Sequence, residues 1–258
     1  MKVFYKMIKV SIITVTWNCA SNIASCLESV RSQRYEFIEH IIVDGASTDG
    51  TADIIRKSLR PGDKFISEAD SGIYDAINKG IRMATGDIVG FLHSDDVFFG
   101  SNVINEIVSA FEVSEVDLVY GNLYYVKKDD LDGVVRRWVA GRYSKINMLF
   151  GWMPPHPTLY VRRELYKNIN YFDISFRISS DYHSVLKLFM IPGVKSYWIK
   201  SPLLKMRVGG ASNASLKNMI LKSSEDFRVL RSVGFCSLCS CFVLLMKNVR
   251  KFPQFIFK

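Results

Sequence analysis

The N-terminal part of the chain alternates between short apolar runs and stretches with helical patterning. The apolar runs are rich in Val, Ile and Phe, which favour buried strands, and they lie at 10–16, 40–43, 64–67 and 87–92. The helical stretches lie at 21–32, 51–59 and 73–84, and the third carries Ile73, Ile77 and Ile81 at i, i+4 and i+8. This order predicts an α/β fold with a doubly wound, mostly parallel sheet flanked by helices.

Polar or aromatic side chains follow each of the four predicted strands. They are Trp17 with Asn18, then Asp44, then residues 68–72, and finally residues 94–96. Ligands of doubly wound sheets bind beyond the carboxyl ends of the strands, which is where these residues must lie. We therefore expect one cleft at this edge of the sheet.

The second half of the chain is less regular. Further strands are expected at 117–120, 123–126 and 134–139, the last pairing with one of the other two. The segment 153–157 contains three prolines and must be a loop. Helices are expected at 180–190 and 215–231, so the chain ends in a helical tail.

Asp95 and Asp96 are adjacent carboxylates that follow a buried strand. Two acidic side chains at such a place repel each other unless a cation lies beside them. Mn²⁺ and Mg²⁺ prefer carboxylate oxygens and often share their sites with substrate phosphates. The pair therefore indicates a divalent-metal site, and the alternative is a solvated turn or a cap for a helix near Ser101.

Four motifs come in a fixed order, namely Thr16-Trp17-Asn18, IIVDGASTDGT at 41–51, DSGIYDAINKG at 70–80, and Gly86-Asp87 with FLHSDD at 91–96. In this order and spacing they resemble the family 2 glycosyltransferases, which have the GT-A fold. The resemblance implies a glycosyltransferase domain over 1–210, with a donor-binding half at about 8–125 and an acceptor half at about 126–210. Residues 211–258 then form a helical, basic tail.

The resemblance assigns nucleotide-sugar contacts to the strand ends. Trp17 matches a position, usually Tyr, whose ring lies against the uracil base, and the alternative is a core aromatic. Asp44 matches the carboxylate that accepts a hydrogen bond from the base, and the alternative is a cap for its own loop. Asp75 of the third motif contacts the donor or only forms a surface pair with Lys79 at i+4.

The last of the four motifs matches the family's metal-binding sequence, which often reads Asp-Ser-Asp-Asp. Here His93 stands in the first place, where it contacts the donor or packs. The resemblance implies that Asp96 binds Mn²⁺ or Mg²⁺ and that Asp95 binds ribose or sugar hydroxyls. His156 matches a region near the donor phosphates, and the alternative is a structural or exposed loop histidine.

Asp181 matches the family's general base, which commonly follows a Glu where this chain has Ser180. The implied reaction is a single in-line displacement with inversion, in which Asp181 takes the proton of the acceptor hydroxyl. The divalent cation neutralises the diphosphate leaving group. The alternative role for Asp181 is a cap of its helix.

The resemblance extends to bacterial O-antigen and surface-polysaccharide enzymes. It implies transfer of a hexose, glucose or galactose, from a UDP-sugar to a lipid-linked acceptor such as N-acetylglucosamine on undecaprenyl diphosphate, in lipopolysaccharide biosynthesis. The alternatives are a nucleotidyltransferase and a catalytically silent nucleotide-sugar-binding protein. The residues after the first strand lack the glycine and arginine typical of nucleotidyltransferases, and the intact acidic residues favour an enzyme.

Basic residues concentrate in the tail of this chain, whose formal net charge is +9, because 227–258 holds six of them and no acidic residue. A nucleic-acid partner is disfavoured, since it needs a basic stripe on the folded domain. The apolar run Phe235–Met246 is too short to span a bilayer and precedes Lys247, Arg250 and Lys251. It predicts a helix lying on an anionic membrane, with a final core helix as the alternative. With no signal peptide visible, we expect a cytoplasmic protein, peripheral on the inner face of the bacterial inner membrane.

Overall fold

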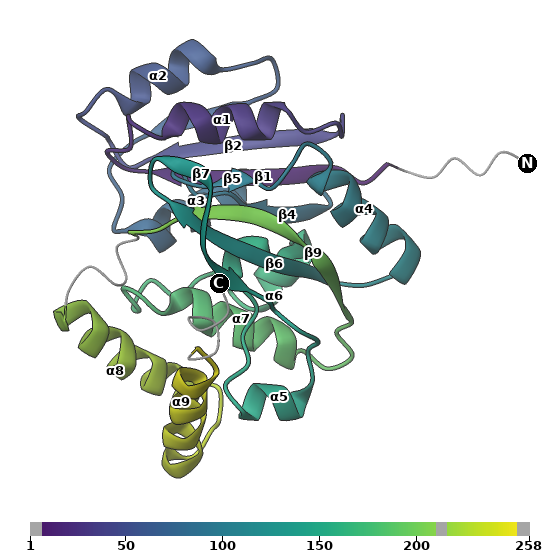
Figure 1. Ribbon diagram of the computed structural model, residues 1–258, viewed down its shortest axis with the longest axis vertical. Coiled ribbons are helices and arrows are strands. Elements are labelled where there is room, and N and C mark those ends of the chain that lie inside the picture. The colour runs from purple at the N-terminus through teal and green to yellow at the C-terminus, as the bar shows by residue number, and fades with distance from the viewer. Residues whose placement is uncertain (1–6, 210–215, 252–258) are drawn as a thin grey trace, which may run out of the picture.

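The computed structural model describes residues 7–209 and 216–251 (Figure 1). The expected boundary between domain and tail at 210/211 lies outside the described residues. So do residues 1–6, which bear on the absence of a signal peptide. The division of the domain at about 125/126 stays a prediction.

A single mixed sheet forms the centre of the molecule, with the strand order β3-β2-β1-β4-β8-β6-β9-β5 and β7 paired to β6. The strands are β1 (Val10–Thr16), β2 (Ile38–Asp44), β3 (Lys64–Ser67), β4 (Ile88–Phe91), β5 (Val97–Phe98), β6 (Leu118–Lys127), β7 (Asp130–Trp138), β8 (Tyr160–Arg162) and β9 (Ser196–Arg207). The strands β1 to β4 pair with one another in parallel, which confirms the predicted doubly wound half.

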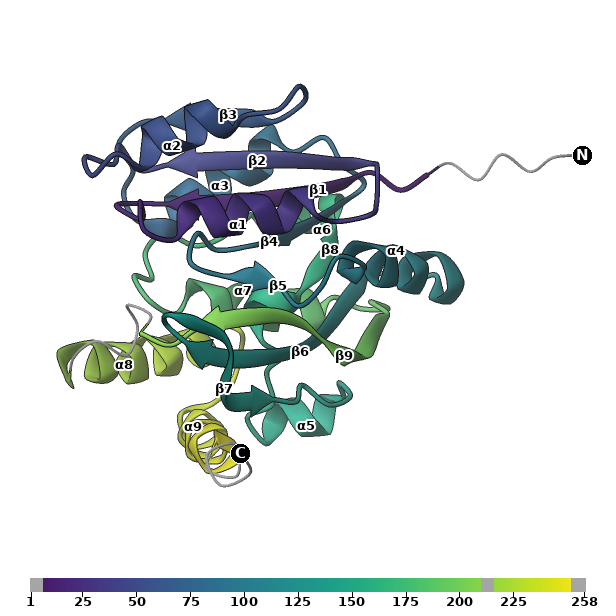
Figure 2. The same ribbon diagram turned by 45° about the horizontal axis from the view of Figure 1, so that its top comes forward.

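Helices cover both faces of the sheet (Figure 2). They are α1 (Ile23–Arg31), α2 (Thr51–Ser58), α3 (Ile73–Met83), α4 (Val103–Ser114), α5 (Lys145–Leu149), α6 (Arg163–Asn168), α7 (Ser180–Met190), α8 (Leu216–Ser232) and α9 (Ser237–Lys251), with a 3₁₀ turn η1 (His156–Thr158). Alternate residues of β1 enter two separate cores: Ile13 packs with α3 and α7, whereas Ile12 packs with α4.

The direction of β8 brings the proline loop to the functional edge of the sheet. Because β8 is antiparallel to β4, its first residue lies toward the carboxyl end of β4. The turn η1 directly precedes β8, so His156 lies at this edge too. The loop expected at 153–157 is therefore a structured entry to a short strand.

The strand β9 was not expected from the sequence. It pairs in parallel with β6 along most of its length, although Pro202 lies in its middle. The register between the two strands shifts around Asn122, opposite this proline, so the missing N–H does not break a regular ladder. The strand ends at Arg207, close to Asp95.

The helical tail packs against the domain at α7 (Figure 1). Glu225 of α8 is buried and accepts hydrogen bonds from the backbone N–H groups of Arg177, Ile178 and Ser179, just before α7 begins. These three bonds satisfy N–H groups at the helix start that would otherwise lack partners. Glu225 therefore fixes the N-terminus of the helix that holds Asp181.

Lys247 joins α9 to the same core. Its ammonium lies 2.8 Å from the Asp226 carboxylate and 3.4 Å from the ring centroid of Tyr182, and the side chains of the ion pair are only 8% and 6% exposed. Burial favours the neutral form of Asp226, but Lys247 and Lys222 outweigh it and hold the pKa of that carboxyl below its usual value. The expectation that Lys247 faces lipid is therefore wrong.

None of the helices within 7–209 and 216–251 has the length and apolar content needed to cross a membrane.

Replacing Lys247 by Met is expected to lower the free energy of unfolding by about 3 kcal/mol, because it leaves Asp226 as a buried charge without its close partner. The double variant Asp226→Leu/Lys247→Met removes both charges and is expected to recover most of this loss. Urea denaturation of the three proteins measures the difference. A single variant as stable as the unchanged chain would show that the ion pair does not hold the tail.

Candidate active site

The register of the sheet aligns the ends of the first three strands. Thr16 of β1 pairs with Asp44 of β2, and Asp44 pairs with Ser67 of β3. Next to β1 on its other side, β4 ends at Phe91, a few residues before Asp95. The four polar segments predicted to meet therefore share one edge, as expected for a doubly wound sheet.

The loops after β1 and β2 are tied to each other. The backbone N–H of Asn18 donates to the Ser47 hydroxyl at 2.8 Å, and the Asn18 side-chain oxygen accepts from the Thr48 N–H at 2.9 Å. Asn18 and Ala46 have φ angles of 47° and 57°, which non-glycine residues seldom adopt. Such left-handed residues concentrate at binding sites that the surrounding structure holds in place.

Asp44 is fully buried and holds the second loop. Its carboxylate accepts hydrogen bonds from the Ser47 hydroxyl, from the Ser47 N–H at 3.0 Å and from the Ser67 hydroxyl at 2.7 Å. The loop-capping role weighed for this residue is thus present. Its proposed hydrogen bond to a base stays a prediction.

Trp17 lies at the surface of the edge with 69% of its side chain exposed, which excludes the core-aromatic alternative. Gly45 separates it from Asp70: a Cβ on Gly45 would lie 2.6 Å from an Asp70 carboxylate oxygen and 3.5 Å from Trp17 Cδ1. Because Gly45 has no side chain, the Trp17 ring and the Asp70 carboxylate can both lie close to its backbone. An exposed indole ring at a strand end is a suitable platform for a planar base.

Asp75 lies in the first turn of α3. It accepts the Ser71 N–H at 3.1 Å and lies 3.7 Å from the Lys79 ammonium, so the surface pair weighed for it exists. Lys79 binds Glu68 more closely, at 2.8 Å. The role of Asp75 toward a donor stays a prediction.

Asp96 is fully buried, and neither of its carboxylate oxygens has a hydrogen-bond partner in the described part of the chain. Burial, and next the neighbouring Asp95 carboxylate, raise the pKa of Asp96 well above its ordinary value. Arg207 lowers the pKa of Asp96 only in part, first through its backbone N–H and then through the charge of its guanidinium. That guanidinium donates to the Asp95 backbone carbonyl and to Ser25. Neither is Asp96 a helix cap, since α4 begins at Val103.

Two histidines, the buried His156 and the half-buried His93, belong to the segments that reach this edge. His156 stacks on Phe91 with ring centroids 5.3 Å apart, and its Nε2 has no hydrogen-bond partner in the described residues. Burial lowers the pKa of His156 to about 4, so the ring is neutral at pH 7. Burial also lowers the pKa of His93, while the charges of Asp95 and Asp181 act in the opposite direction.

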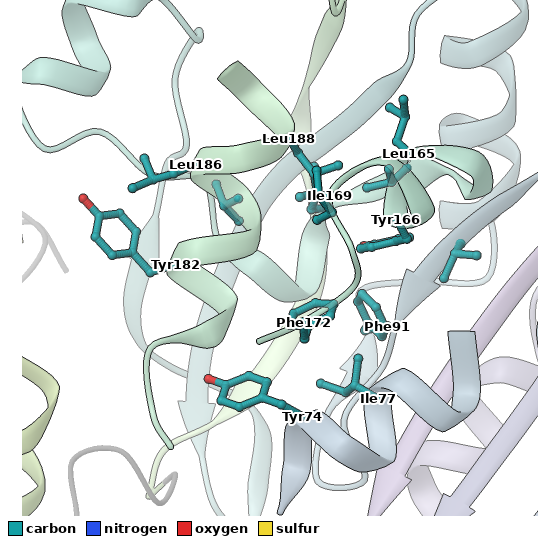
Figure 3. Packing of buried hydrophobic residues seen from close by; sticks show 14 of the residues in the cluster. Tyr74, Ile77, Phe91, Leu165, Tyr166, Ile169, Phe172, Tyr182, Leu186 and Leu188 are labelled. Atoms are coloured by element: carbon teal, nitrogen blue, oxygen red, sulfur yellow. The ribbon is translucent and has the colours of Figure 1, made fainter. Parts of the chain in front are cut away.

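Asp181 enters the site from the first turn of α7. Its Oδ1 accepts the Tyr182 N–H at 2.7 Å and the Tyr74 hydroxyl at 3.4 Å, and Tyr74 also donates to the Ile178 carbonyl. Figure 3 shows Tyr74, Phe91 and Phe172 packed together beneath α7. The rings of Tyr74 and Phe172 stack with their centroids 5.8 Å apart. The aromatic core thus sets where this carboxylate lies relative to the strand ends.

The model of the family described as glycosyl transferase family 2 matches residues 11–181, which is more than half of the chain. The chain belongs to glycosyl transferase family 2. A PGL/p-HBAD biosynthesis glycosyltransferase of Mycobacterium bovis (strain BCG / Pasteur 1173P2) is 29% identical to it over 217 residues, covering 82% of each chain. An uncharacterized glycosyltransferase of Mycobacterium tuberculosis (strain ATCC 25618 / H37Rv) is 33% identical over 192 residues, covering 70% of this chain and 69% of its own.

Solved structures show the same fold. S. aureus TarS 1-349 in complex with UDP-GlcNAc superposes with a TM-score of 0.68 at 17% identity, covering 95% of this chain and 73% of that one. This chain spans 43% of a longer S. aureus TarS. The mannosyltransferase PcManGT from Pyrobaculum calidifontis, in complex with GDP-Man and Mn²⁺, superposes with a TM-score of 0.66 at 20% identity. The match covers 98% of this chain and 74% of that one.

These comparisons confirm the GT-A fold and the family predicted from the four motifs. The protein is therefore a glycosyltransferase. Membership of this family excludes the nucleotidyltransferase alternative.

The residues of this glycosyltransferase fit a divalent cation at Asp96. A buried carboxylate whose two oxygens make no hydrogen bond within the described residues has the chemistry of a hard-cation ligand. Within the described ranges, no group of three or more His, Cys, Asp or Glu side chains is placed to hold a metal alone. A cation at Asp96 would therefore take its remaining ligands from the donor diphosphate and from water.

Three residues of the site region were not singled out from the sequence. Arg207 lies at the end of the unexpected β9, Tyr74 precedes Asp75 in a motif whose acids drew attention, and Glu225 lies in the tail. The sequence signals for them are weak, because each acts through a contact between segments about 50 or more positions apart.

Asp96→Asn is expected to raise the free energy of unfolding of the metal-free protein at pH 7 by about 1 kcal/mol or more, because it removes an uncompensated buried charge. A folded-state pKa raised above the unfolded value means that stability is present at low pH and is lost as pH rises through the folded pKa. The advantage of Asn should therefore vanish toward pH 4.

Thermal and urea unfolding at pH 4 and pH 7 measure this effect, with the exposed Asp53→Asn as a control. An Asn variant that is less stable than the unchanged protein at pH 7 would show that Asp96 has a partner of its own in the fold.

Proposed function

We propose that the protein is an inverting, metal-dependent hexosyltransferase that moves glucose or galactose from a UDP-sugar to a lipid-linked acceptor. The observation that supports this most is the buried, unpartnered Asp96 at the sheet edge that Trp17 and Asp44 also occupy. A site built this way leaves a negative charge to be neutralised at the place where a diphosphate is expected. The TarS complex with UDP-GlcNAc adds support for a uridine donor.

The donor is bound across the ends of the strands in this proposal. Trp17 offers its exposed ring to the uracil, and Asp44 accepts a hydrogen bond from the base. Asp95 takes ribose or sugar hydroxyls, and Asp75 borders the same space. Mn²⁺ or Mg²⁺ bound at Asp96 would supply neutralisation of the diphosphate as the glycosidic bond breaks.

Asp181 is the proposed general base. Both hydrogen bonds that the described residues make to its carboxylate go to Oδ1, which leaves Oδ2 for the proton of the acceptor hydroxyl. The acceptor oxygen then attacks the anomeric carbon, the bond to the UDP oxygen breaks, and the configuration inverts. Tyr74 and Glu225 act as positioning residues because they hold the segment from which Asp181 projects.

The acceptor that we propose is N-acetylglucosamine on undecaprenyl diphosphate, extended at the inner face of the bacterial inner membrane in O-antigen synthesis. The donor-binding half at about 8–125 would supply the nucleotide contacts, and the half at about 126–210 would face the acceptor. The basic tail, whose side chains favour an anionic surface, supports a membrane location.

Asp181→Asn is expected to lower kcat by about 10²-fold to 10⁴-fold while leaving UDP affinity unchanged, because Asn keeps the Oδ1 acceptor and loses the base. Steady-state rates and calorimetric UDP binding check the two halves of this expectation. If the variant kept most of its turnover, the base would be another residue. Asp53→Asn, the same change at an exposed position, is the matched control.

The donor and cofactor are tested by a panel of nucleotide sugars with a synthetic N-acetylglucosamine diphosphate lipid. We expect product from UDP-glucose or UDP-galactose with Mn²⁺ or Mg²⁺, and none with excess chelator, because Asp96 cannot bind a diphosphate without a cation. Faster transfer from a guanosine or thymidine sugar would overturn the donor, and binding of UDP-sugars without any transfer would favour the silent-protein alternative.

A further inference from the structure

The helix α9 has two unlike faces. Ser240, Val243 and Lys247 are buried against the rest of the protein. On the opposite side, an apolar stripe at i, i+4, i+7 and i+11 faces solvent, made of Leu238, Phe242, Leu245 and Val249. Packing of the domain therefore accounts for one face of α9 and leaves the other uncovered.

The short helix α5 extends this stripe. Ile146, Leu149 and Phe150 are exposed, and the ring of Phe150 meets that of Phe242 edge to face with centroids 5.6 Å apart. Gly151 allows this contact, because a Cβ there would lie 2.3 Å from the backbone nitrogen of Lys247. Figures 1 and 2 both place α5 beside α9 at the end of the molecule opposite α2. We call these seven apolar residues of the two helices the α5–α9 face.

The two segments that carry the α5–α9 face have basic side chains and no acidic ones. Neither 133–163 nor 227–251 contains an Asp or a Glu. Lys145 is exposed beside Ile146, and Arg250 donates to Asn147 of α5. An apolar surface on segments whose charged side chains are all basic is complementary to an anionic bilayer, whose interior accepts apolar side chains and whose headgroups attract basic ones.

We propose that the α5–α9 face docks this glycosyltransferase on the surface of an anionic lipid bilayer. The inference rests on the proposed lipid-linked acceptor and names the surface by which the enzyme reaches it. The buried side of α9 contacts Tyr182 through Lys247, and Tyr182 follows Asp181 directly. Docking through α5 and α9 therefore holds the proposed base close to the membrane in which the acceptor is anchored.

The test uses the full-length chain and sedimentation with vesicles of phosphatidylcholine and phosphatidylglycerol, without any sugar substrate. Leu238→Glu and Ile146→Glu place a charge on α9 and on α5, and each is expected to lower vesicle binding by about tenfold. Val113→Glu on α4 is the matched control, because Val113 is 85% exposed and Leu238 is 84% exposed. Binding should also fall with added salt and on pure phosphatidylcholine vesicles.

A second measurement separates docking from catalysis and from folding. Hydrolysis of the donor in the absence of acceptor is expected to be equal in all four proteins, since the three substituted side chains are exposed and have no role in the proposed donor site. Circular dichroism reports the fold. Vesicle binding unchanged by both substitutions would overturn the α5–α9 face. A face that instead mediates a dimer, which both substitutions dissociate while vesicle binding is absent, would also overturn it. Failure of sugar transfer with normal vesicle binding would count against the proposed function alone.

Discussion

The parallel pairing of β1 with β2 on one side and with β4 on the other is the constraint on which this site depends. It brings Trp17, Asp44 and the segment 93–96 to one edge, although they are separated by up to about 80 positions in the chain. The antiparallel β8 then returns the chain to the same edge with His156, and the aromatic core under α7 places Asp181 beside them. Each proposed role follows from this convergence.

Convergence of this kind has an energetic cost, because it collects acidic groups where water is excluded. Asp44 avoids the cost by accepting three hydrogen bonds from the serines beside it. Asp96 does not, since both of its oxygens lack partners among the described residues. Asp44 ends β2 and Asp96 follows β4, and these strands lie on either side of β1. The contrast between these two buried carboxylates is the main reason for giving Asp44 a loop-holding role beside its proposed bond to the base, and for placing the cation at Asp96.

The sequence was informative where the structure is local. Short apolar runs and helical patterns predicted β1 to β4 and α1 to α3, and α7 was expected over its observed range of 180–190. The two strands expected at 117–120 and 123–126 are one strand, β6, which continues through Gly121 and Asn122 although its register to β9 shifts there. The strand β9 was missed because Pro202 argues against a central strand, and only the register shift opposite it makes the strand possible.

Long-range pairing explains the remaining differences. The sequence shows Lys247 as one of several basic residues after an apolar run, and nothing near it shows that Asp226 lies 2.8 Å away. The tail therefore has both of the characters weighed for it, a packed face and an exposed apolar face. Nothing in the sequence near Glu225 shows that it caps α7, because the N–H groups that donate to it are more than forty positions away.

The central claim is that Asp96 is built for a cation shared with a diphosphate. Calorimetric binding of UDP with saturating Mn²⁺ and with excess chelator tests it most directly, because UDP brings the diphosphate without any chemistry. The account predicts that Mn²⁺ tightens UDP binding by about tenfold or more, since the cation removes the repulsion between the buried acids and the phosphates. UDP that binds equally well in chelator would contradict the account.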